Sequence, residues 1–96
     1  MKNRELYQQK VQAQLDEWRA DFDKFKAKAS DASADSQLDI NRNLKSLEAK
    51  IEEGRKKLSE ISDFGEETWD SASENVRSGW ESVKSGANDA IARLKR

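Results

Sequence analysis

Carboxylates are the side chains of this chain whose type and spacing could support chemistry. Glu52 with Glu53 and Glu66 with Glu67 are adjacent pairs of acids, as a carboxylate metal site could use. Helical di-iron proteins combine such acids with Glu-x-x-His motifs, and this chain of 96 residues has no histidine. Because Glu52 and Glu53 each precede a lysine by four residues, we interpret them as part of a solvated helix face. We therefore expect no metal site.

The rest of the chemical inventory is equally short. Without histidine or cysteine, the chain lacks the commonest general base, the thiol nucleophile and the zinc ligands of nitrogen and sulfur type. Its four glycines are too scattered for a phosphate-binding loop. A sequence pI of about 5.5 with interleaved acids and bases argues against nucleic-acid binding. We expect a protein that is not an enzyme, with no cofactor, no nucleic acid and no small-molecule substrate.

Composition indicates the elements that must position any functional surface. Charged residues make up 39% of the chain, apolar residues 34%, and there is no proline. This combination is typical of long solvated helices and coiled coils. Disorder is the competing interpretation of low hydrophobicity. The near cancellation of opposite charges, at a net charge of -1, and the regular spacing of apolar residues favour an all-α fold.

The C-terminal half carries two apolar rows with an eleven-residue repeat. Eleven residues are very nearly three turns of α-helix, so each row stays on one face of a helix. Such a stripe fits a straight helical partner or a flat lipid surface. The two rows are Leu58, Trp69, Trp80 and Ile91, and, three places further on, Ile61, Ala72, Val83 and Leu94.

Apolar residues in the N-terminal half step by threes and fours, which is the heptad-like pattern of coiled coils. Between the two heptad runs, Ser30 to Gln37 has the composition of a loop. Phe22 and Ile40 nevertheless stand eighteen residues apart, five full turns, so the helical phase is kept across this stretch. We predict one long helix from about residue 4 to 61. If the loop is real, the alternative is a three-helix bundle of similar-length helices.

A boundary is predicted at residues 62–65. Gly65 weakens a helix through this point, and Asp63 with Glu66 has the spacing of a capping box, with Ser62 as the alternative cap. Acids gather after the boundary and bases near the C-terminus, which complements a helix dipole. We predict a second helix over about 63–95, and a single elongated helical unit over 1–96.

The apolar stripe needs a partner, because an isolated helix cannot bury it. The second helix folds back on the first, or copies associate, or a lipid or protein surface covers the stripe. We predict sixteen residues as this interaction face: Leu15, Trp18, Phe22, Phe25, Leu44, Leu47, Ile51, Leu58, Ile61, Trp69, Ala72, Val76, Trp80, Val83, Ile91 and Leu94.

Two functions fit such a face. The first is a non-enzymatic coiled-coil scaffold that acts by self-association, as a homo-oligomer, or by helix-mediated partner binding. The alternative is peripheral binding to a lipid or membrane surface through the second helix, because Trp69 and Trp80 share one face. The lack of a polybasic cluster favours uncharged over anionic lipid. Since no stretch is apolar enough for a signal core or a membrane span, we expect a cytoplasmic protein.

The sequence also resembles the small bacterial proteins described as coiled-coil domain-containing. This resemblance implies a cytoplasmic helical protein of poorly defined role, of a kind grouped loosely with stress-response and apolipoprotein-like chains. It brings no catalytic residue or cofactor. It covers nearly the whole chain but depends on short motifs of low specificity: Gln14-Leu15-Asp16-Glu17-Trp18, Trp69-Asp70, and Trp80-Glu81 with Val83-Lys84.

Overall fold

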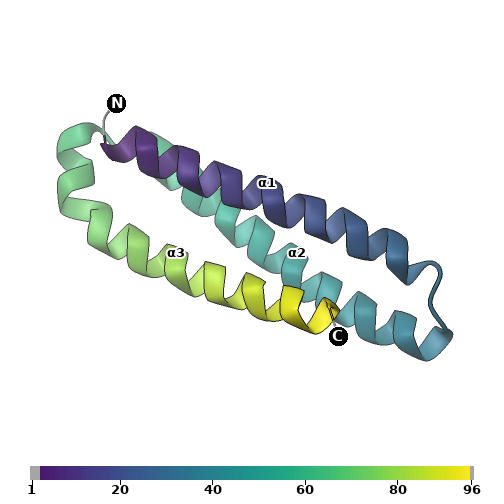
Figure 1. The fold of residues 1–96 in the computed structure, drawn as a ribbon. Helices are drawn as coiled ribbons and strands as arrows, with labels where there is room; N and C mark the ends of the chain where they lie inside the picture. The colour runs from purple at the N-terminus through teal and green to yellow at the C-terminus, as the bar shows by residue number, and fades with distance from the viewer. Residues whose placement is uncertain (1–2, 96) are drawn as a thin grey trace.

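Three helices of similar length make up the part of the chain that the structure describes, and consecutive helices are antiparallel. The computed structural model describes residues 3–95, and its helices are α1 (Asn3–Ala29), α2 (Ala34–Asp63) and α3 (Glu66–Leu94). They run up, down and up, so that α1 and α3 are parallel to each other and antiparallel to α2 (Figure 1). The molecule measures 53 × 20 × 17 Å along its principal axes. The all-α prediction is confirmed, in the form of the three-helix alternative.

The prediction of one helix from about residue 4 to 61 is wrong, because the chain turns at residues 30–33. Ser33 adopts an extended conformation (φ −62°, ψ 162°), and its Oγ accepts a hydrogen bond from the backbone N–H of Ser36. Ser30 Oγ donates to the carbonyl of Ala27, and the Gln37 amide donates to that of Ala32. Polar side chains therefore satisfy backbone groups that a continuous helix would pair internally.

The second turn lies at the predicted boundary but is built differently from the prediction. Asp63 is the last residue of α2, and Phe64 and Gly65 alone connect it to α3. The N-cap of α3 is Gly65, which makes no side-chain hydrogen bond, so the capping box of Asp63 with Glu66 is not formed. The acidic first turn of α3 at Glu66 and Glu67 still complements the helix dipole.

The core is wholly apolar. Among residues 3–95 no polar or charged side chain is buried, and the largest fully buried side chains are Trp18 and Trp69. Each helix presents one apolar face to the other two, as helices in water must to gain stability from packing.

Candidate interaction face

All sixteen residues of the predicted interaction face lie in the interior of the bundle. Phe22, Leu58 and Ala72 are partly buried against the core cluster, and the other thirteen are buried. The face that was expected to need a partner is therefore covered within one chain. Other buried positions lay outside the prediction: Val11 and Ala29, which continue the spacing of α1, and the small residues Gly54, Ala87 and Ala90.

Aromatic pairs bridge α1 and α3. Trp18 stacks on Trp80 with ring centroids 5.2 Å apart and an interplanar angle of 23°, and Tyr7 packs at 5.4 Å on Trp69. Tyr7 and Trp18 are eleven residues apart, as are Trp69 and Trp80. The parallel helices thus match one eleven-residue row with another. The row in α1 could have been found in the sequence from this spacing.

Lysine stems and glycines meet between α2 and α3. A Cβ atom added to Gly86 would lie 2.5 Å from Cε of Lys50, and one added to Gly79 would lie 3.3 Å from Cε of Lys57. Lys50 pairs with Glu53 at 3.2 Å, so its stem covers the helix while its ammonium stays at the surface. The two glycines therefore fix an antiparallel register in which Lys50 faces Gly86 and Lys57 faces Gly79.

All three helices meet at Gly54. A Cβ atom added there would lie 2.5 Å from Cδ2 of Leu15 in α1 and 3.2 Å from Cζ3 of Trp80 in α3. The glycine makes room for both side chains, which explains a poor helix former in the middle of α2.

Charged side chains of α1 and α3 pair near the second turn and lie beside the ring of Tyr7. Arg4 Nε lies 3.7 Å from Glu66 Oε1, and the guanidinium carbon of Arg77 lies 5.6 Å from the Tyr7 ring centroid. Burial raises the pKa of Tyr7 above its usual value of 10.0; the charge of Glu81 adds to this effect and that of Arg77 opposes it. These charged groups lie at one end of the interface between α1 and α3.

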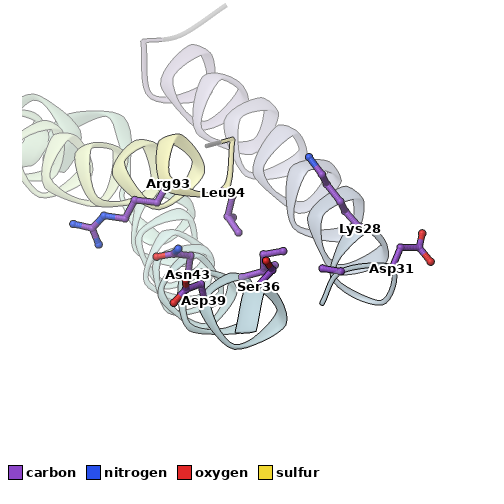
Figure 2. Close-up of a pocket in the computed structure, with 9 residues that line it drawn as sticks. Lys28, Asp31, Ser36, Asp39, Asn43, Arg93 and Leu94 are labelled. Atoms are coloured by element: carbon purple, nitrogen blue, oxygen red, sulfur yellow. The ribbon is translucent and has the colours of Figure 1, made fainter. Parts of the chain in front are cut away.

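The opposite end of the bundle is open. α2 runs past the end of α3 (Figure 1), which leaves a hollow of about 670 Å³ lined by residues that include Asp39, Arg93 and Leu94. Figure 2 shows Leu94 directed into this space, while the charged ends of Arg93 and Asp31 point to opposite sides. The charged side chains of the lining are exposed, so the hollow lacks the buried polar groups that fix the orientation of a small ligand.

The interaction face has one phase along the whole chain. At about 100° per residue, its sixteen members fall within roughly 120° of each other on one continuous helix through residues 15–94. Neither turn of the bundle requires this agreement, because a turn can restart a helix at any phase. The apolar face is therefore compatible both with the folded-back bundle and with longer helices made by straightening a turn.

Chemical sites and family relationships add nothing to this face. Within residues 3–95 no group of three or more acids could hold a metal ion, and no helix there is both long and apolar enough to cross a membrane. Neither a model of a known protein family, nor the sequence of a characterised protein, nor a solved structure matches this chain.

Proposed function

We propose that the protein is a non-enzymatic helical scaffold that acts by self-association through its interaction face. The observation that supports this function is the common phase of the face across both turns. A bundle that only had to fold on itself gains nothing from that phase, whereas chains that pair through longer helices need it to keep one continuous apolar stripe. The expected cytoplasmic location remains a prediction.

The outer surface of the closed bundle is a poor alternative for association. Among residues 3–95 the exposed large hydrophobic side chains are Leu6, at 48% exposure, and Leu38, at 66%. They lie at opposite ends of the bundle, because Leu6 is near the start of α1 and Leu38 near the start of α2. Two isolated leucines do not form the contiguous apolar patch that marks a protein interface.

Sedimentation equilibrium tests self-association. The purified chain is refolded from urea at low and at high protein concentration, so that any pairing that needs partial unfolding is free to occur. We expect a mass that shifts from one chain to two or more as the concentration during refolding increases. Leu6→Glu and Leu38→Glu variants serve as controls and should associate like the parent. A single-chain mass under every condition would rule out self-association.

Lipid-surface binding is the second candidate, and one buried group favours it. Among residues 3–95 the indole N–H of Trp18 is buried without a hydrogen-bond partner, which costs about 1–3 kcal/mol in the closed bundle. At a membrane interface an indole keeps its ring in the apolar layer and its N–H in water. An opened chain would therefore recover at a lipid surface a hydrogen bond that the bundle lacks.

Flotation with lipid distinguishes this candidate. The protein is mixed with phosphatidylcholine vesicles, with triolein droplets and with anionic vesicles, and bound protein is collected with the lipid. The helix α3 carries six acids and three bases within Glu66–Leu94, so we expect binding to uncharged surfaces rather than to anionic ones. Recovery of all the protein in the lipid-free fraction would exclude the candidate.

A further inference from the structure

We infer that two copies of this chain exchange α3: the turn at Phe64–Gly65 straightens, α2 and α3 become one helix, and the α3 of each copy packs on the α1 and α2 of the other. The inference rests on the proposed self-association and identifies the partner and the exchanged element. Exchange of an identical element needs no new surface, because the contacts of α3 with α1 and α2 are formed again between chains.

The backbone of the second turn is already close to helical. Phe64 has φ −78° and ψ 136°, and Gly65 has φ −79° and ψ 169°. Both φ angles lie within the scatter of an α-helix, near −63°. Only the two ψ angles must rotate, to about −42°, for the helix to continue from Asp63 to Glu66. No proline stands in the way, since the chain contains none.

Few contacts hold this turn in its closed form. Gly65 provides no side-chain cap for α3, and a Cβ atom added to Gly65 would meet nothing within 4 Å. The Phe64 N–H bonds to the carbonyl of Ile61, and the Phe64 ring lies 6.3 Å from that of Trp69. Straightening gives up the contact between Phe64 and Trp69 and gains continuous backbone hydrogen bonds through the turn.

The geometry of the straightened form requires a second copy. A helix over residues 34–94 would be roughly 90 Å long at the usual rise per residue, so its α3 part could no longer reach the α1 and α2 of its own chain. The buried faces of α2 and α3 share one phase and would form an unbroken stripe along this helix. Two such helices lie antiparallel, with the straightened turns near the two-fold axis, and each α1 covers its own α2 and the partner's α3.

Two substitutions at the turn push this equilibrium in opposite directions. Gly65→Ala adds a side chain where space is open and replaces a poor helix former inside the long helix. We expect it to tighten the dimer by about 25-fold, or about fivefold for each chain. Glu66→Pro places proline at the first position of α3, where the bundle accepts it, but in the long helix it clashes with the preceding turn. Glu66→Ala is its control, because it also removes the contact with Arg4.

Crosslinking between differently labelled chains detects the exchange itself. The chain has no cysteine, so Lys50→Cys is introduced into one preparation and Gly86→Cys into another. These positions face each other across α2 and α3. The two preparations are mixed in urea, refolded at high concentration and treated with a short thiol-reactive crosslinker. In a closed bundle the two cysteines belong to separate molecules, whereas in the exchanged dimer they lie side by side. Lys50→Cys with Glu67→Cys is the control pair, because Lys50 of α2 faces Gly86 and Glu67 lies at the other end of α3.

Each outcome decides a different point. A heterodimer crosslinked through Lys50→Cys and Gly86→Cys but not through the control pair, strengthened by Gly65→Ala and lost with Glu66→Pro, supports the exchange. Dimers that do not crosslink in this pattern, or whose stability changes with neither turn substitution, overturn the exchange, while self-association stands. A single-chain mass for the parent and for Gly65→Ala overturns both.

Discussion

The two turns of the bundle are held in different ways. The turn at residues 30–33 is fixed by hydrogen bonds that the side chains of Ser30 and Gln37 donate and that of Ser33 accepts. The turn at Phe64–Gly65 has no side-chain cap and depends on packing of aromatic rings, with Trp69 between Phe64 and Tyr7. The first turn specifies its own backbone locally. The second turn is held closed by the contacts that α3 makes once it has folded back on α1 and α2. It is therefore the turn at which we propose that the chain opens.

Substitution of Trp69, the ring that packs against the second turn, should give the largest change in stability. Trp69 is 1% exposed and packs against Tyr7 of α1 and Phe64 of the second turn. We expect Trp69→Ala to lower the free energy of unfolding by about 3–5 kcal/mol, from lost burial and the cavity left behind. Urea unfolding followed by circular dichroism measures this loss. Leu38→Ala, beside the first turn and largely exposed, is the control and should change stability by less than about 0.5 kcal/mol.

Comparable losses for the two variants would contradict the contrast between the turns. They would mean that Trp69 is not packed between α1 and the second turn in solution, and that α3 is held mainly by its contacts with α2.

Substitution of the N-cap residues after the two turns should give a smaller effect, and this effect should fall mainly on the first turn. Ser33 Oγ accepts the N–H of Ser36, so Ser33→Ala should cost about 1 kcal/mol. Gly65 makes no side-chain hydrogen bond. Alanine is a poorer N-cap than glycine, but it also lowers the conformational entropy of the unfolded chain, so Gly65→Ala should change the stability of the closed bundle by only about a few tenths of a kcal/mol. Thermal and urea unfolding of the two variants at low protein concentration measure the difference. A Ser33→Ala variant as stable as the parent would show that the first turn is not stabilised by its serine.

Residue spacing was sufficient to group the apolar residues but not to predict the path of the chain. Leu15, Trp80 and the other face residues fall on one stripe whichever residue begins the next helix, and they lie in the interior of the bundle although the single long helix was wrong. The turn at residues 30–33 was missed because the helical phase kept between Phe22 and Ile40 fits a three-helix bundle as well as one long helix. What decides is the capping by Ser33, and a serine among several polar residues is a weak signal in a sequence.

The second boundary was predicted for a partly incorrect reason. The break at residues 62–65 was found from Gly65 and the acids that follow it, yet Asp63 ends α2 and does not cap α3. An aspartate can cap a helix or end the preceding one; here Gly65 takes the N-cap position of α3, and the Phe64 ring packs 6.3 Å from that of Trp69. The contact between Phe64 and Trp69 forms only when the turn folds, so the spacing of residues in the sequence does not reveal it.

Alkaline pH provides the smallest effect, through Tyr7 of α1, which packs on Trp69. Burial raises the pKa of Tyr7 above 10.0 in the folded chain, whereas the unfolded chain keeps the ordinary value. The stabilisation from a neutral Tyr7 is therefore complete below pH 10 and is lost as the pH rises from 10 through the folded pKa, because the unfolded phenol ionises first. We expect the unfolding free energy of the parent to fall more steeply in this window than that of Tyr7→Phe. Tyr7→Phe differs from the parent only by the phenol hydroxyl, so the difference between the two chains isolates Tyr7.

The titration can also be observed directly, because Tyr7 is the one tyrosine of the chain. Tyrosinate absorbance of the folded protein should show a midpoint above 10, and the same measurement in urea should return the ordinary midpoint. Trp69→Ala removes the ring on which Tyr7 packs and should bring the folded midpoint toward the unfolded one. A parent that titrates at the ordinary value would mean that the second turn is already open in solution, so that its aromatic packing would not hold α3 on α1.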